Sequence, residues 1–493
     1  MRRWLVLLFA LPAAARGDDP PKPAAKDKET AVHTKHSVTV GGKVLEYEAT
    51  AGLMPLTDDD GKVQARVFYT AYTKPGADPA TRPLLFSFNG GPGSSSVWLH
   101  LGIFGPKRVA LTDGGEAPPP PAALVDNEAT ILDLADLVFI DPVGTGFSRA
   151  ADEKTANKQF HGVQEDVLSV GDFIRLYVTK NQRWGSPKYV AGESYGTTRA
   201  AALAGHLQNR LGMRLNGVLL VSAVLNFGTI RFDEGNDLPF VLYLPGYAAT
   251  AWYHKALADR PADLAAFLTE VEAFAAGEYA TALHKGASLT DAERTAVADK
   301  VAKYTGLSAE FVKRNDLRVE GQRFMRELLR GRGQTVGRYD SRLLGKDAND
   351  AAERPEYDPS YAAVQGPYTE AFNAYVRGPL KYESDLPYEI LTGKVQPWNY
   401  GPAGSNRYVN VAPTLRGAMA QNPALRVFVA NGYYDLATPY TATKYTVDHL
   451  GGDAKLRDRV TMAYYEAGHM MYIHAASRAK LRADVAKFLT AQP

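Results

Sequence analysis

The chain has 493 residues, of which 45% are hydrophobic and 22% are charged, and its formal net charge is +2. These values are typical of a globular protein and exclude a strongly charged surface for nucleic acid or an anionic membrane. The absence of cysteine excludes disulfides, a cysteine nucleophile and thiolate metal sites. A chain of this length holds one large domain with an insertion, or two to three ordinary domains.

The N-terminus has the composition of an export signal. Arg2 and Arg3 are basic, residues 4–11 are apolar, and three alanines at 13–15 resemble a cleavage site. We therefore predict a signal peptide at residues 1–15 and export to the periplasm or the extracellular space. The apolar run is too short to span a bilayer, so we expect no integral membrane segment after cleavage. Residues 16–34, rich in Pro, Lys and Asp, are predicted to form a disordered tether.

Residues 35–73 alternate in polarity, with turn residues at 41–42 and 58–61. This pattern predicts antiparallel hairpins at the edge of a sheet. The acidic turn at 58–60 lacks the spaced ligands of a calcium loop, so a hairpin turn is the better interpretation.

Short apolar runs alternate with helical patterns along the rest of the chain. The runs are residues 84–88, 137–140, 189–191, 218–224, 426–430 and 460–465, and the helical patterns are 163–179, 197–211 and 476–489. Continuous apolar strands that alternate with helices indicate a mostly parallel sheet flanked by helices. The fold class is therefore predicted to be α/β.

The region at 228–405 differs in texture and is predicted to be an insertion packed over the strand ends. Helical patterns at 251–283, 290–305 and 321–329 precede a polar loop region at 331–368, so we expect a helical cap. Within the loop region, the acidic run at 347–350 is predicted to be solvated surface. The insertion divides the core into residues 35–227 and 406–493.

A Gly-Glu-Ser-Tyr-Gly motif at residues 192–196 lies between a predicted strand and a predicted helix. This context is what a Gly-x-Ser-x-Gly match requires for a nucleophile elbow of the α/β-hydrolase fold. The flanking glycines allow a tight turn, which places Ser194 at the carboxyl end of the strand, beside the N-terminus of the helix. Ser194 is thus the candidate nucleophile.

The partners of such a serine follow in the order Asp, then His. Asp435 lies just beyond the run at 426–430, and His469 lies just beyond the last run, so both share the edge of Ser194. The imidazole would take the serine proton, and the carboxylate would hold the imidazole in the correct tautomer. His474 lies inside the following turn or helix, and Asp448 follows no strand through a glycine; Asp458 likewise does not.

A glycine-rich loop at residues 89–96 follows the first apolar run. Its amides can stabilise an oxyanion together with the amide of Tyr195. A phosphate cradle is the alternative interpretation, but no lysine stands where a nucleotide loop needs one. We expect no metal and no cofactor.

Three motifs together resemble those of the serine carboxypeptidase family: Asn-Gly-Gly-Pro-Gly-Ser-Ser at 89–95, Asp-Pro-Val-Gly-Thr-Gly-Phe-Ser at 141–148, and the elbow. The resemblance is to a bacterial-type member of that family. The likeness covers about residues 84–228 and 426–471. It implies an oxyanion hole formed by the amides of Gly91 and Tyr195. It also implies that the carboxylate of a peptide substrate is received by Asn89, Gly90 and Glu193.

The sequence departs from the family pattern in two places. Ser94 stands where the family usually has a cysteine, and Ile103 stands where a second glutamate is common. Two close carboxyl groups resist joint ionisation, so Glu193 would need a proton to bind the substrate carboxylate, and cleavage should favour acidic pH. Both this pH preference and strict removal of C-terminal residues depend on the second acid. An esterase or acyltransferase with the same three residues is the nearest alternative, and a catalytically silent binding protein is a more distant one. The sequence indicates no oligomeric state.

Overall fold

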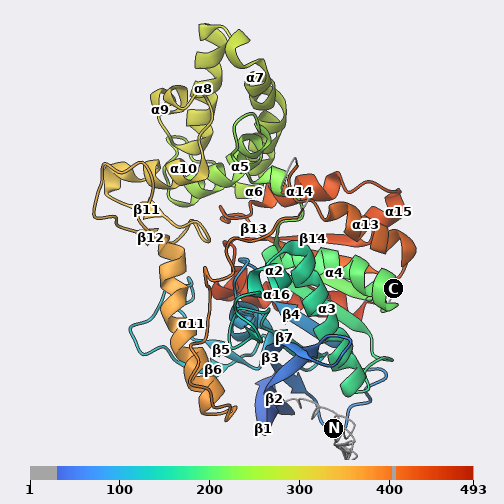
Figure 1. Ribbon diagram of the computed structural model, residues 1–493. Coiled ribbons are helices and arrows are strands. Elements are labelled where there is room, and N and C mark those ends of the chain that lie inside the picture. The colour runs from blue at the N-terminus through green and yellow to red at the C-terminus, as the bar shows by residue number, and fades with distance from the viewer. Residues whose placement is uncertain (1–29, 402–406, 492–493) are drawn as a thin grey trace, which may run out of the picture.

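The computed structural model describes residues 30–401 and 407–491. Its centre is one mixed sheet in the order β1-β2-β3-β7-β4-β9-β10-β13-β14, with the short β8 paired to β3 (Figure 1). The strands are β1 Thr30–Val40, β2 Lys43–Thr57, β3 Val63–Thr73, β4 Leu84–Phe88, β7 Asp136–Ile140, β8 Arg149–Ala150, β9 Lys188–Ser194, β10 Gly217–Ala223, β13 Arg426–Gly432 and β14 Val460–Tyr465. Each apolar run predicted as a strand forms one.

The first strands form the predicted antiparallel hairpins. β1 pairs with β2, β2 with β3, and β3 with β7, all antiparallel, while every pair from β7 to β14 is parallel. β1 begins at Thr30, so residues 30–34 belong to this strand and the prediction of a tether there is wrong. The predicted signal peptide and residues 16–29 lie outside the described residues.

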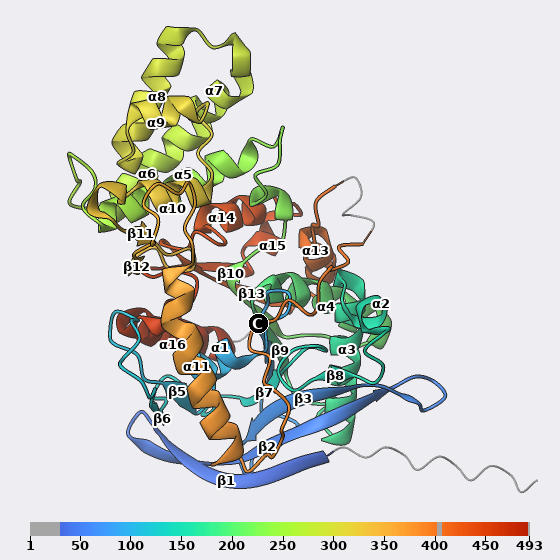
Figure 2. The ribbon, with the colours of Figure 1, turned by 60° about the vertical axis from the view of Figure 1, so that its left-hand side comes forward.

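Helices cover both faces of the sheet (Figures 1 and 2). One layer contains α3 and α4, with α13 beside them, and the other contains α1, the π-helical turn η1, α11 and α16. Their bounds are α1 Val97–Leu99, η1 His100–Phe104, α3 Val163–Lys180, α4 Tyr195–Leu211, α11 Pro359–Arg377, α13 Ala412–Gln421 and α16 Ala475–Thr490. The smaller flanking elements are β5 Lys107–Val109, β6 Leu124–Asp126, α2 Ala156–Phe160, α14 Tyr440–Asp448 and α15 Ala454–Arg457.

Successive strand residues enter opposite cores, as the pleat requires. Leu84 and Phe86 pack against the layer of α3 and α4, whereas Leu85 packs against that of α11 and α16. Since both faces are apolar, the strands read as continuous hydrophobic runs. The parallel strands end at one edge, which brings the loops after β4, β9, β13 and β14 together.

The insertion has two parts that pack differently. A lobe of helices projects beyond the strand ends (Figures 1 and 2) and encloses its own core, to which Tyr434 and Tyr440 of the main domain contribute. The lobe helices are α5 Leu238–Tyr253, α6 Leu264–Phe274, α7 Ala280–Lys285, α8 Asp291–Thr305, α9 Ala309–Arg314 and α10 Gly321–Glu327. The second part, residues 335–401, returns along the main domain.

The predicted loop region at 331–368 contains more structure than its pattern indicated. β11 (Thr335–Val336) and β12 (Leu344–Gly345) pair into a short hairpin, here called the β11–β12 segment, residues 335–345. α11 begins at Pro359, where the side chain of Asp358 accepts the amide of Ser360 as an N-cap. Phe372 and other residues of α11 are part of the main core, so this helix is no component of a cap.

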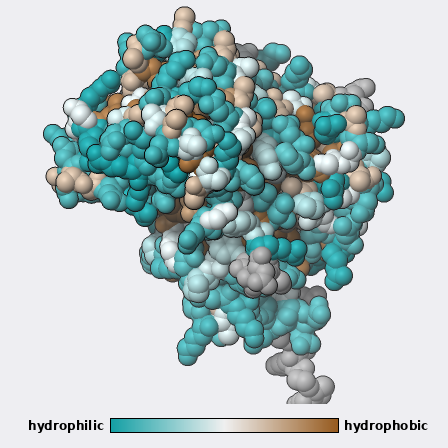
Figure 3. All heavy atoms as spheres, turned by 90° about the horizontal axis from the view of Figure 1, so that it is seen from above, coloured by the Kyte–Doolittle hydropathy of each residue, from teal (hydrophilic) through white to brown (hydrophobic). Residues whose placement is uncertain are grey.

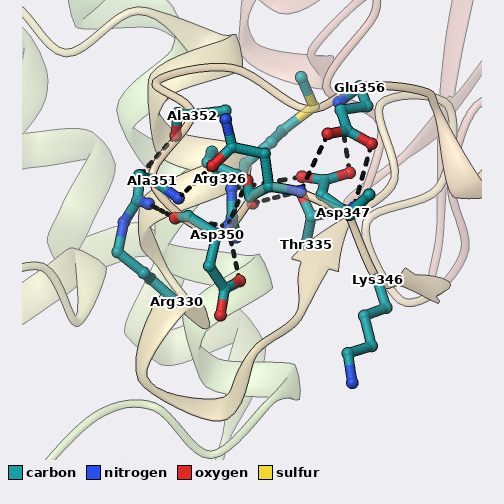
Figure 4. A network of polar contacts seen from close by, with 12 residues as sticks. Arg326, Arg330, Thr335, Lys346, Asp347, Asp350, Ala351, Ala352 and Glu356 are labelled. Carbon is teal, nitrogen blue, oxygen red and sulfur yellow. Dashed lines mark hydrogen bonds and ion pairs between the residues drawn. The ribbon is translucent and has the colours of Figure 1, made fainter.

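The prediction that residues 347–350 are solvated surface is wrong for Asp347. Its carboxylate lies 3.2 Å from Nε of Arg326, and both side chains are fully buried (Figure 4). Asp350 remains largely exposed but accepts a hydrogen bond from Arg326 at 2.8 Å. A buried arginine needs a counter-charge, which explains why this acidic run folds onto α10. The network ties the loop after β12 to the lobe.

The surface seen from the side of the lobe is mostly hydrophilic, with hydrophobic residues largely in recesses (Figure 3). Among residues 30–401 and 407–491, no helix has both the length and the apolar character needed to cross a bilayer.

Candidate active site

Ser194 is the last residue of β9 and has φ 59° and ψ −129°, a conformation that non-glycine residues rarely adopt. The chain turns directly into α4. A Cβ on Gly192 would lie 2.1 Å from the carbonyl oxygen of Gly196, and one on Gly196 would lie 2.9 Å from that of Phe88. Only glycine fits at either position, so the elbow predicted from the motif is present.

Asp435 and His469 meet at the end of β13 and β14. Nδ1 of the imidazole lies 2.7 Å from Oδ2 of the carboxylate, and the two residues are 1% and 2% exposed. His469 lines the same pocket as Ser194. Burial disfavours the charged imidazole, but the charge and hydrogen bond of Asp435 outweigh it, and the pKa of His469 is raised.

The carboxylate of Asp435 is fixed by the turn that follows it. Oδ1 accepts the amides of Ala437 and Thr438 at 2.8 and 2.9 Å, and Oδ2 accepts the Thr438 hydroxyl at 2.8 Å. Charge-assisted hydrogen bonds of this kind are the strong ones. They leave the carboxylate one orientation, directed at Nδ1 of His469.

The β11–β12 segment lies between the loops that carry these two residues. The carbonyl of Tyr339 accepts the amide of His469 at 2.6 Å, and Oδ2 of Asp340 accepts the amide of Gly468 at 3.0 Å. On the other side, the carbonyl of Arg338 accepts the amide of Leu436 at 3.0 Å. The insertion therefore contacts both loops directly.

The glycine-rich loop after β4 packs against the N-terminus of α4. A Cβ on Gly90 would lie 2.4 Å from the amide nitrogen of Tyr195, and Gly91 has φ +100°. The carbonyl of Asn89 accepts Nη1 of Arg199 at 2.6 Å. Arg199 is itself buried and paired with Asp166 at 2.8 Å, so a buried ion pair supports this loop.

The motif at residues 141–148 has a structural role next to the same loop. Oδ1 of Asp141 accepts both the amide and the hydroxyl of Ser96 at 2.8 Å. A Cβ on Gly146 would lie 1.8 Å from Oδ2 of Asp141, which explains the glycine. Burial raises the pKa of Asp141 to about 6. The motif thus anchors the end of the glycine-rich loop.

A pocket opens beside Ser194. Its polar lining includes Asn89, Glu193 and His469, and the remaining wall is mainly aromatic or apolar: Trp98, Tyr339, Tyr361, Val364, Leu391 and Met470. Tyr361 and Val364 come from α11, which therefore shapes the pocket rather than covering it.

Glu193 lines this pocket and is 3% exposed. Burial raises its pKa to about 7, although His469 and the hydrogen bonds of Tyr472 and Asn89 oppose the rise. Oε2 accepts the Tyr472 hydroxyl at 2.6 Å. Ile103, at the position of the expected second acid, is fully buried in the apolar core.

All eight predicted site residues meet at this edge. Six of them line the pocket, Asp435 bonds to His469, and the amide of Tyr195 adjoins Gly90. His474 instead bonds to Ser477. Four residues that support the site were not predicted from the sequence. Thr438 fixes the carboxylate of Asp435, Tyr339 and Asp340 support the loop of His469, and Tyr472 bonds to Glu193. Thr438 and Tyr472 each lie three residues after a predicted site residue, Asp435 and His469 respectively, so local sequence could have indicated these two.

A mostly parallel sheet, a strained serine between β9 and α4, and a paired aspartate and histidine on later loops define an α/β-hydrolase. The serine carboxypeptidase family model matches residues 41–475. The chain belongs to this family.

The relatives are distant. Serine carboxypeptidase-like 45 of Arabidopsis thaliana is 27% identical over 225 residues, 39% of this chain and 43% of that protein. Serine carboxypeptidase-like 26 of Oryza sativa subsp. japonica is 31% identical over 218 residues, 43% of this chain and 40% of that protein. The chain thus matches about two-fifths of the length of these relatives.

One solved structure shares the fold over most of both chains. It is KEX1(delta)p, a prohormone-processing carboxypeptidase from Saccharomyces cerevisiae, which is 19% identical. The alignment covers 90% of this chain and 91% of that one, with a TM-score of 0.55.

Proposed function

We propose that this protein is a serine-type carboxypeptidase that removes C-terminal residues from peptides through an acyl-enzyme on Ser194. The observation that carries the proposal is a buried acid, Glu193, that adjoins the serine in the sequence and lines the same pocket as His469. A protonated acid at this position can donate a hydrogen bond to the terminal carboxylate of a peptide substrate.

The proposed reaction uses the Asp435–His469 pair and the pocket that His469 shares with Ser194. Nε2 of His469 takes the proton of Ser194 as Oγ attacks the scissile carbonyl, while Asp435 holds Nδ1–H and stabilises the imidazolium. The amides of Gly91 and Tyr195 donate to the oxyanion. The imidazolium then gives its proton to the leaving amine, and a water molecule, activated by the same histidine, hydrolyses the ester.

Recognition of the terminal carboxylate requires a proton on Glu193. A carboxylic acid donates a hydrogen bond to a carboxylate, whereas two carboxylates at close range repel. Asn89 and Gly90 complete the site as further donors. Because the pKa of Glu193 is raised to about 7, the acid keeps its proton up to near neutral pH.

The two shifted groups predict a pH profile with a definite sign. His469 works as a base only when neutral, and since its pKa is raised, activity increases as pH rises through a value above the usual one for histidine. For free-acid substrates, activity falls again as Glu193 ionises around pH 7. Amidated substrates lack this second limb.

The test compares N-blocked dipeptides with free and amidated C-termini from about pH 5 to pH 9. The wild type is expected to prefer the free acid below pH 7 and to lose that preference above it. In Glu193→Gln the side-chain amide donates at every pH, so the preference should persist above pH 7. Glu310→Gln, the same change on an exposed helix of the lobe, serves as the control.

Equal turnover of both substrates at all pH values, unchanged in Glu193→Gln, would contradict the carboxypeptidase assignment and favour an esterase or acyltransferase. Peptides are the proposed partners. The basic residues and the apolar run at the N-terminus support the proposed export. We propose in addition that the chain is a bacterial-type member of the family.

A further inference from the structure

The contact between Glu193 and Tyr472 is not explained by the reaction as described above. The phenol is 1% exposed, and its hydroxyl donates to Oε2 of the carboxyl group at 2.6 Å. Tyr472 lies in the 3-10 turn η6 (Met471–Ile473), immediately after the loop of His469. The proposed base and the proposed carboxylate-binding acid are therefore joined through three residues of chain and one hydrogen bond.

The space for this phenol is provided by a glycine on the opposite wall. A Cβ on Gly102, in η1, would lie 2.3 Å from Cε2 of Tyr472, so any larger residue would displace the ring. The next residue, Ile103, occupies the position of the missing second acid and points into the apolar core. η1 therefore contributes no carboxyl group to the site, and its glycine leaves room for the Tyr472 ring.

The groups that face Glu193 come from every element around it. His469 and Tyr472 come from the last loop, Asp435 from the loop after β13, and Tyr339 from the β11–β12 segment. Tyr368 of α11 and Asn89 complete the set. Because burial holds the pKa of Tyr472 well above its usual value, the phenol stays protonated throughout the working range.

We propose that Tyr472 is a positioning residue for Glu193. The Tyr472 hydroxyl takes the place of a second carboxyl group and donates to Oε2 of Glu193. The proton of the acid therefore resides on Oε1, from which it is donated to the substrate carboxylate. This inference rests on the proposed function. Two carboxyl groups can exchange a shared proton among four oxygens. The phenol of Tyr472 keeps its own proton, so in this contact only the proton of Glu193 titrates, and it stays on Oε1. One ionisation, that of Glu193, then controls recognition of the free acid.

The consequence can be measured with Tyr472→Phe, which keeps the ring and removes the hydroxyl. The lost hydrogen bond stabilises the ionised form of Glu193, so its removal should move the pH midpoint of free-acid preference upward by about one unit, the size expected for a bond to a charged group. With Oε2 unoccupied, KM for the free acid at low pH should rise about tenfold. Turnover of the amide should be unchanged.

Tyr368→Phe is the matched control, since it removes a second buried hydroxyl close to Glu193 and leaves the bond to Tyr472 intact. Its midpoint should stay within a few tenths of a pH unit of the wild type, about the effect expected for a neutral group that makes no bond to the acid. Gly102→Ala reaches the contact from the other side, because its methyl group displaces the Tyr472 ring, and should reproduce the effects of Tyr472→Phe.

The outcomes separate this inference from the function on which it rests. If the wild type shows no preference for the free acid at any pH, the carboxypeptidase assignment fails. If the wild type shows the preference and Tyr472→Phe keeps both its midpoint and its KM, the role of Tyr472 is refuted. Equal losses on free-acid and amidated substrates in Tyr472→Phe also refute it, since general damage to the site has that result.

Discussion

The edge of the sheet and the β11–β12 segment contribute to one site in different ways. The edge presents Ser194 at the end of β9, and Asp435 and His469 on the loops after β13 and β14, which is where the fold places the proposed reacting groups. The segment at 335–345 supplies backbone carbonyls and one carboxylate to two of those loops. We infer from this difference that the sheet places the proposed reacting groups, whereas their alignment depends on the insertion.

The largest effect is expected at the edge itself. Ser194→Ala removes the nucleophile and should lower kcat by about 10⁶-fold, as in other serine triads. Because the side chain is small and the backbone conformation is held by the glycines around it, the melting temperature should change little. A residual rate within tenfold of the wild type would show that the reaction proceeds elsewhere.

Asp435→Asn tests the alignment within the edge. The amide is uncharged and can donate to Nδ1, which favours the wrong tautomer of His469, so kcat should fall by about 10⁴-fold. Steady-state kinetics on the free-acid dipeptide measures the loss. A loss much smaller than that of Ser194→Ala is expected, and an equal loss would mean that the fold of the loop has changed.

Asp340→Asn carries the test into the β11–β12 segment. Its carboxylate accepts the amide of Gly468 and pairs with Arg342 at 2.6 Å. Removal of the charge should shift the histidine loop and reduce kcat/KM about 10- to 100-fold, the usual result of misplacing a catalytic group by an ångström or less. Rates are to be divided by the concentration of titrated active sites, so that unfolded protein does not contribute. An unchanged rate would contradict the alignment role of the insertion.

The smallest effect on rate is expected at Asp347, which holds the segment only indirectly. Asp347→Asn leaves the buried Arg326 without its main counter-charge and should lower the free energy of unfolding by about 3–5 kcal/mol, measured by urea denaturation. Turnover per folded site should stay within a few-fold of the wild type. The control is Asp350→Asn, whose carboxylate is 67% exposed and should matter less.

Local pattern was sufficient to predict the edge of the sheet. Each strand is an apolar run bounded by glycine or proline, and each proposed reacting residue follows such a run within a few positions, so topology alone places these residues together. Asn89, Gly90 and Glu193 also required the family resemblance, because no local pattern assigns a carboxylate site.

The insertion was less predictable because its contacts join distant segments. The acidic residue at 347 has a buried partner 21 positions earlier, and nothing in the local sequence indicates that pairing. The bonds from 338–340 to the catalytic loops use mainly backbone carbonyls, which carry no sequence signal. The start of α11 was readable, since Asp358 followed by proline is a common helix start, but the polar residues before it favoured a loop.

The central claim is that three distant segments form one hydrogen-bonded relay, and covalent labelling tests it most directly. A fluorophosphonate should modify the folded wild type at one site, Ser194, identified by mass spectrometry of the labelled peptide. Labelling should be lost in His469→Ala and greatly slowed in Asp435→Asn. Modification of a different residue, or an unreactive Ser194 in a correctly folded wild type, would contradict the account.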